Sequence, residues 1–142
     1  MPRKFIFGLQ PLVDRRKQVE EAAQRVVAMR RSERDEAQRE LDRLEAQLRV
    51  HASLLREQQR ELPVSELAVR YDHLQTLERA IAAQRVLLSK CGETLEDACQ
   101  DLATASKKRT VVEKLKGRHE ARAIAAEIRA EEAEIDESNA SG

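Results

Sequence analysis

The side chains that could perform catalysis or bind a metal are few and widely spaced in this sequence. His51, His73 and His119 are far apart along the chain, and no Cys-x-x-Cys or His-Glu-x-x-His motif occurs. The four glycines form no phosphate-binding loop. Acidic runs such as residues 131–134 are typical of a solvated helix face. We therefore expect no catalytic residue, no metal site, no cofactor and no enzyme activity.

The two cysteines indicate a cellular compartment rather than a reaction. Cys91 and Cys99 are eight residues apart in a helical pattern, about 12 Å by the helical rise, which is too far for a disulfide. Unpaired thiols are typical of the reducing cytosol. Pro11 and Asp14 interrupt the apolar start of the chain, and no run approaches the roughly 18 apolar residues of a membrane span. The sequence predicts a cytoplasmic protein without membrane insertion.

Charged side chains that could bind a partner are unevenly distributed. Residues 1–34 contain nine Lys and Arg against four Asp and Glu, and residues 107–122 contain seven against two, whereas residues 66–105 and 123–142 are acidic. Basic stretches attract phosphate, but here they lack interleaved aromatic side chains and a nucleic-acid-binding motif. We expect no nucleic-acid partner. Ordinary solvation of two helices remains an alternative explanation of the pattern.

Two long helices are needed to position these charges, and a leucine-rich repeat in steps of three and four predicts them. In the first arm the predicted seam positions are Leu9, Leu12, Arg16, Val19, Ala23, Val26, Arg30, Glu33, Ala37, Leu41, Leu44, Leu48, His51, Leu55, Gln58 and Leu62. In the second arm they are Leu77, Ile81, Gln84, Leu88, Cys91, Leu95, Ala98, Leu102, Ala105, Arg109 and Val112. Successive steps of four from Glu33 to Ala37 to Leu41 predict a stutter in the first arm.

The repeat is broken once, at Pro63. Proline removes an amide donor and disfavours helix at Leu62, while Ser65 and Glu66 are suited to cap the next helix and to complement its dipole. A charged fraction of 37% with few aromatics allows little more than a seam to be buried. We predict an all-α fold, two long helices forming an antiparallel coiled-coil hairpin with a turn near Pro63. A bent rod that pairs with a second molecule is the alternative.

The predicted organisation is a single hairpin over residues 1–142. Its parts are helix one at about 10–61, a loop at 62–65, helix two at about 66–136 and a disordered acidic tail at 137–142. In such a hairpin Leu48 should lie near Leu77, and Leu88 and Leu95 should be buried. The two basic stretches should meet opposite the loop.

Three segments resemble the flagellar export protein FliJ family. They are residues 5–12, residues 71–81, and residues 107–116 with the later Glu134-Ile135-Asp136-Glu137. The length of the chain, the position of the loop and the longer second helix agree with that family. Stalk proteins of virulence-type type III secretion systems share this plan and remain an alternative.

The resemblance implies a component of the flagellar type III protein export apparatus, cytoplasmic and peripheral to the inner membrane. Members resemble the coiled-coil part of the γ subunit of rotary ATPases. They insert the end with both termini into the hexameric export ATPase, promote its assembly and hydrolysis, and reach the export-gate protein FlhA. They also handle export chaperones, so a chaperone-escort adaptor without rotor action is a further alternative.

The resemblance also assigns candidate contact residues. By this likeness the export-gate contact maps to Tyr71, Leu74 and Leu77, with His73 where a second aromatic is expected. Together with the charge pattern, it gives six candidates for the ATPase-ring contact: Arg15, Arg16, Lys17, Lys107, Lys108 and Arg109.

Overall fold

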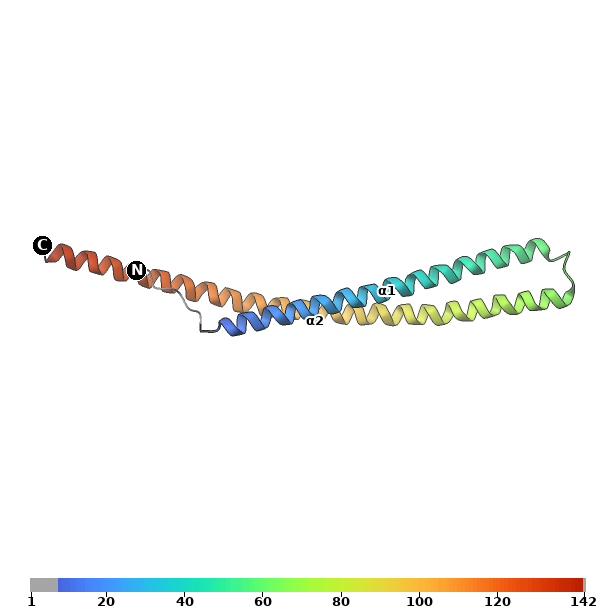
Figure 1. Ribbon diagram of the computed structural model, residues 1–142, viewed down its shortest axis with the longest axis horizontal. Helices are drawn as coiled ribbons and strands as arrows, with labels where there is room; N and C mark the ends of the chain where they lie inside the picture. Colours follow the sequence, from blue (N-terminus) through green and yellow to red (C-terminus); the bar gives the residue numbers. More distant parts are fainter. Residues whose placement is uncertain (1–7, 142) are drawn as a thin grey trace. The chain divides into compact units, whose positions relative to one another are not determined.

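The computed structural model describes residues 8–141, which form two helices joined by a short loop (Figure 1). Helix α1 is Gln10–Gln58 and helix α2 is Val64–Ala140. No strand occurs within this part of the chain. The predicted all-α hairpin with a turn near Pro63 is confirmed.

Helix α1 begins where the sequence predicts. The carbonyl of Leu9 accepts the first bonds, from the amides of Leu12 and Val13 at 2.9 and 3.1 Å. Pro11 lies in the first turn, where a missing amide proton costs nothing because that proton has no intrahelical acceptor. The side-chain amide of Gln10 donates to Asp14 one turn later, at 3.0 Å.

The turn around Pro63 is slightly longer and differently capped than predicted. Helix α1 ends at Gln58 rather than near 61, and the carbonyl of Gln58 accepts bonds from the amides of Glu61 and Leu62. Helix α2 begins at Val64, and the carbonyl of Pro63 accepts from Leu67 at 3.0 Å. Pro63 therefore occupies the N-cap position, where its carbonyl accepts the first helical bond, but its ring offers no oxygen to cap the free amides. The assignment of this role to Ser65 was wrong.

Helix α2 also extends further than predicted. It continues to Ala140, whereas a disordered tail was expected from 137. The amide and hydroxyl of Ser141 donate to the carbonyl of Glu137 and close the last turn. Alanine and glutamate are strong helix formers, so the acidic composition of this segment does not prevent helix. Gly92 and Gly117 lie inside α2, as predicted.

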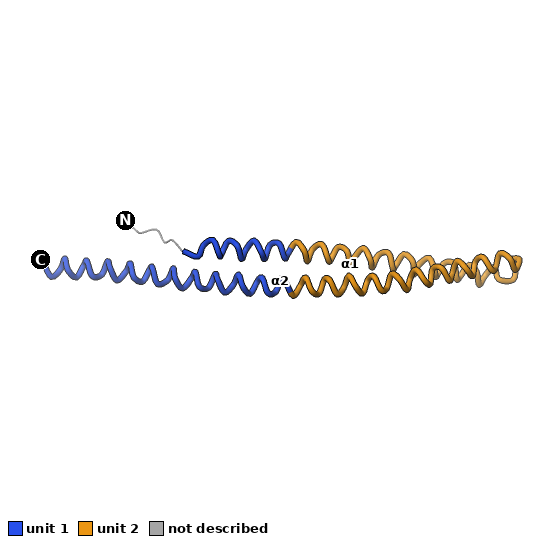
Figure 2. Tube along the Cα trace, turned by 90° about the horizontal axis from the view of Figure 1, so that it is seen from below, with its two compact units in different colours: residues 1–24, 101–142 blue, residues 25–100 orange. Residues whose placement is uncertain are grey.

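The chain divides into two compact units, each containing a part of both helices (Figure 2). Unit 1 is Met1–Gln24 with Asp101–Gly142, and unit 2 is Arg25–Gln100. The expectation that residues 1–142 form one domain stays a prediction. No helix in residues 8–141 is both long and apolar enough to cross a membrane.

Unit 2 contains the larger apolar cluster. Buried side chains of α1 and α2 pack together there, and Leu48, Ala80 and Leu88 pack against them: the buried members are Leu41, Leu44, Leu77 and Ile81. The predicted proximity of Leu48 and Leu77 is confirmed. The seam residue Gln84 donates to the carbonyl of Ala37 at 3.0 Å, so this polar side chain also joins the two helices.

The predicted seam of α2 is confirmed at every position. Six of its side chains are buried and the other five are half-buried. Leu95 is buried as expected, while Leu88 is half-buried and packs against the unit 2 cluster. Leucine, alanine and cysteine occupy most of these positions, so the sequence marks the face of α2 that packs against α1.

The predicted seam of α1 is confirmed from Ala37 to Gln58, whereas in its first half Arg16, Ala23 and Arg30 are covered but Leu9 and Glu33 are exposed. The seam that the structure shows on α1 runs in steps of three and four, with exposed Arg34 as its one gap. Its covered members are Val13, Arg16, Glu20, Ala23, Val27, Arg30, Ala37, Leu41, Leu44, Leu48, His51, Leu55 and Gln58. Leu12, Val19 and Val26 are exposed instead. Since the series has no double step of four, the predicted stutter is absent from it.

The reason for this error is chemical. Arg16, Ala23 and Arg30 belong to both possible registers, which differ only in the residues between them. Hydrophobicity favoured Val19 over Glu20, but Glu20 has an ion-pair partner on α2 that makes its burial tolerable.

Candidate partner-binding surfaces

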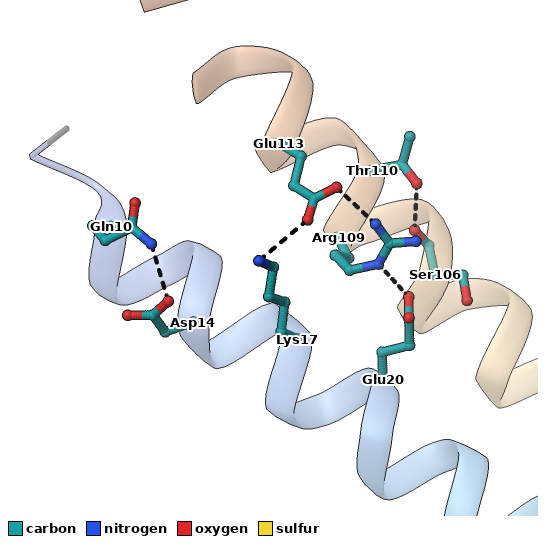
Figure 3. Close-up of polar contacts among 8 residues, drawn as sticks. All are labelled: Gln10, Asp14, Lys17, Glu20, Ser106, Arg109, Thr110 and Glu113. Atoms are coloured by element: carbon teal, nitrogen blue, oxygen red, sulfur yellow. Dashed lines mark hydrogen bonds and ion pairs between the residues drawn. The ribbon is translucent and has the colours of Figure 1, made fainter. Parts of the chain in front are cut away.

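The helices of unit 1 are joined by a small apolar contact and by ion pairs. Val13 and Val112 are buried against each other, with Leu115 packed beside them. Beside this contact, Arg109 of α2 donates two hydrogen bonds (Figure 3). Its Nε donates to Glu20 of α1 at 2.6 Å, and its Nη1 donates to Glu113 of α2 at 2.7 Å. Polar groups therefore join the two helices beside the apolar seam of this unit.

Lys17 completes this network. Its Nζ lies 3.7 Å from the second carboxylate oxygen of Glu113, so Glu113 is shared between Lys17 of α1 and Arg109 of α2 (Figure 3). The predicted meeting of the two basic stretches is therefore seen within unit 1. The network, defined as Lys17, Glu20, Arg109 and Glu113, partly neutralises the charges that meet there.

Titration of the network follows from its hydrogen bonds. The bond donated by Arg109 holds the pKa of the Glu20 carboxyl below its usual value of 4.5, against the opposing effect of desolvation, and a hydrogen bond from Ser106 acts in the same direction as Arg109. The bond to Glu20 likewise raises the pKa of Arg109. Both residues therefore remain charged at neutral pH, and the ion pair persists.

The six basic candidates fall into three groups. Arg15, Lys107 and Lys108 are exposed. Lys17 and Arg109 belong to the ion-pair network. Arg16 is half-buried on the seam, and its Nε has no hydrogen-bond partner among residues 8–141. Arg15, Lys107 and Lys108 are exposed and lie outside the network, whereas Arg109 primarily holds α1 and α2 together.

Sequence reasoning missed Glu20 and Glu113 as members of this site. A signal for Glu113 was present, because Arg109 and Glu113 are four residues apart on one helix face. Glu20 and Arg109 are 89 residues apart, and only the correct α1 register places them together.

Unit 1 also exposes an apolar stripe on the last part of α2. Ile124, Ile128 and Ile135 are at least half exposed, at 54%, 50% and 59%. Their spacings of four and seven residues place them on one helix face.

In unit 2 the three gate candidates differ in exposure. Leu77 is only 6% exposed and belongs to the apolar cluster with Leu41, Leu44 and Ile81, so its side chain supports the fold. Leu74 is half-buried, and Tyr71 is 48% exposed. Of the three, Tyr71 presents most surface to a partner.

Unit 2 brings two of the histidines together near the loop. The rings of His51 and His73 meet edge to face, with centroids 4.7 Å apart. They line a cavity of about 210 Å³ with Val69 and Arg70. His51 was predicted on the seam, but its pairing with His73 was missed, although both stand at similar distances in sequence from Pro63.

Other chemistry-bearing side chains of unit 2 are not gathered into a site. Cys91 and Cys99 are free thiols and half-buried. Residues 8–141 contain no group of three or more His, Cys, Asp or Glu arranged to hold a metal ion.

Comparison with known proteins identifies the family of this chain. Comparison with protein-family models matches residues 5–141 to one family, described as flagellar FliJ protein. Searches of curated proteins and of solved structures give no match. The matched residues include both helices and the candidate contact residues of unit 1 and unit 2. The chain belongs to the flagellar FliJ protein family and is a flagellar export-associated coiled-coil protein.

Proposed function

We propose that this protein is the central stalk that promotes the export ATPase ring and links it to the export gate FlhA. The observation that carries the proposal is the exposed basic surface of unit 1, defined as Arg15, Lys107 and Lys108. These side chains come from two stretches far apart in sequence, and the ion-pair network joins those stretches.

The two parts of this surface have different tasks in the proposal. The network joins α1 to α2, because Arg109 binds carboxylates on both helices. The exposed lysines and arginine present a pattern of positive charge that comes from both helices. Such a pattern attracts and orients an acidic ring interior, and it acts mainly on association rate and specificity.

The gate contact is proposed for Tyr71 and Leu74 in unit 2. Tyrosine provides a large apolar face and a polar hydroxyl, a combination enriched at protein interfaces. Leu77 has an indirect part, because its burial in the apolar cluster holds the preceding turn of α2 in place. The chain would thus contact two partners through two different units.

A chaperone-escort role is the second candidate, and the exposed isoleucine stripe favours it. An amphipathic helix of a partner can pack against such a stripe. The two candidates differ in what the basic surface does, since an escort needs no contact with the ATPase interior.

The test crosses two variants with two partners. Arg15→Glu, Lys107→Glu and Lys108→Glu combined should weaken binding to the purified export ATPase at least tenfold and leave binding to the FlhA cytoplasmic domain unchanged. Tyr71→Ser with Leu74→Ser should do the reverse, while circular dichroism shows both variants helical. Loss of both partners in both variants, or of neither, contradicts the proposal of two separate contacts.

A further inference from the structure

The cavity between His51 and His73 is lined by side chains that can all donate hydrogen bonds, apart from one valine. His51 comes from α1, and Val69, Arg70 and His73 come from α2. An imidazole donates at least one N–H, and a guanidinium donates five in a planar fork. No carboxylate lines this cavity within residues 8–141.

Arg70 forms no ion pair with a carboxylate of the described residues, unlike some other arginines of unit 2. Arg30, Arg43 and Arg85 each bind a glutamate within 4 Å, whereas no carboxylate of residues 8–141 lies that close to Arg70. Glu66 lines an adjoining cavity with Ser65, Val69 and Arg70, but it forms no ion pair there. Arg70 therefore lines both cavities as a half-buried cation with no counter-ion of its own.

Apolar surface lies directly beside this cation. Val69 lines both cavities with Arg70 and is 67% exposed. An anion held by Arg70 alone would make no use of this apolar side chain. A ligand that has an apolar group next to its anionic group would cover both kinds of surface.

We propose that this cavity binds a carboxylate side chain of an acidic protein segment, whose neighbouring apolar residue packs on Val69. The guanidinium of Arg70 binds the carboxylate as a charge-assisted pair, and the imidazoles of His51 and His73 donate further bonds. The inference uses only unit 2 and does not rest on the proposed stalk function.

A metal ion fits the same side chains less well. Two imidazoles at this separation could bind one transition metal, but the positive charge of Arg70 in the same cavity opposes a divalent cation. No third ligand of the usual kinds completes the pair within residues 8–141. Charge complementarity therefore selects an anion.

The proposal can be tested on the full chain with imidazole ¹⁵N NMR. The probe is a short peptide of alternating leucine and glutamate, with a leucine–glutamine peptide as its uncharged match. The glutamate peptide should shift the signals of His51 and His73 in a saturable way and leave His119 unchanged. Arg70→Gln should weaken binding at least tenfold, Arg70→Lys should weaken it less, and Arg79→Gln, an exposed arginine on the same helix, should have no effect.

Several outcomes would overturn the proposal. Equal binding of the glutamine peptide would remove the role of the carboxylate, and unchanged affinity in both Arg70 variants would remove the role of the guanidinium. Inorganic phosphate or phosphatidylglycerol vesicles that produce the shifts when the peptide does not would replace the protein segment by a small anion or a lipid surface. The Arg70→Lys variant keeps the test valid if Arg70→Gln loses helicity.

Discussion

The two units join the same pair of helices with different chemistry. Unit 2 packs leucine and isoleucine from both helices into one cluster, with Gln84 as its satisfied polar member. Unit 1 has a smaller apolar contact between Val13 and Val112, and beside it Arg109 bonds to glutamates of both helices. An apolar seam stabilises through the surface it removes from water, whereas ion pairs add direction and specificity at little net stability.

Because of this difference, we expect unit 2 to contribute more to stability and unit 1 to contribute more to recognition. Exposed ion pairs contribute little to folding because solvent screens them, so a seam built on them is easily changed by pH and salt. The same charged side chains leave a basic surface around the network. Unit 1 is thus expected to be the more adaptable pairing of the two, and unit 2 the more stable one.

The largest effect should come from truncating the apolar seam of unit 2. Leu77→Ala or Ile81→Ala removes a buried side chain and should lower the free energy of unfolding by about 2 to 5 kcal/mol. Val112→Ala in unit 1 removes fewer atoms from a smaller cluster and should cost less. Urea denaturation followed by circular dichroism measures both. An equal cost in the two units would show that their seams do not differ as described.

Replacing the two glycines inside α2 should have an intermediate effect on stability, and this effect is a gain rather than a loss. A Cβ added at Gly92 in unit 2 or Gly117 in unit 1 would meet no atom within 4 Å. Each Gly→Ala change should therefore stabilise the protein by about 1 kcal/mol, through helix propensity alone. Thermal unfolding measures this gain. A loss of stability in either variant would mean that the glycine is needed for a contact that the helix geometry does not show.

The smallest effect should be the pH dependence of the unit 1 network. Because its folded-state pKa is depressed, Glu20 contributes stability above its unfolded pKa of about 4.5 and loses that contribution as pH falls through the folded value. Glu20→Gln should therefore be less stable than the parent at pH 7, with the difference shrinking toward pH 3. Unfolding free energies at both pH values measure it.

Glu40 supplies the matched control for that measurement. Its pKa is also lowered by a hydrogen bond, but the donor is Arg43 on the same helix, so Glu40→Gln should not change the pairing of the helices. A disulfide introduced between α1 and α2 in unit 1 should remove the loss of stability caused by Glu20→Gln. The loss of stability caused by Glu40→Gln should stay unchanged. Equal responses of the two variants would show that bridging the helices adds nothing.

The fold was largely predictable from the sequence, and the site was less so. The α2 seam could be read because its apolar positions admit one register, and Pro63 marks the turn. The first half of α1 could not, because its register depends on Glu20, whose burial requires a partner 89 residues away. Within the gate motif the predicted seam already includes Leu77 and leaves out Leu74, so the burial of Leu77 was readable from the sequence although the family resemblance assigned it to the gate contact.

Stimulation of the export ATPase tests the central claim, that the basic surface of unit 1 acts on the ring. The variant Arg15→Glu, Lys107→Glu and Lys108→Glu leaves the network and both seams intact, and its matched control reverses three exposed basic residues of unit 2, Arg49, Arg56 and Lys90. At physiological salt the first variant should lose most of the stimulation of ATP hydrolysis, and the control should retain it. If the unit 1 variant stimulates hydrolysis as well as the parent, its basic surface is only solvated and the stalk proposal is contradicted.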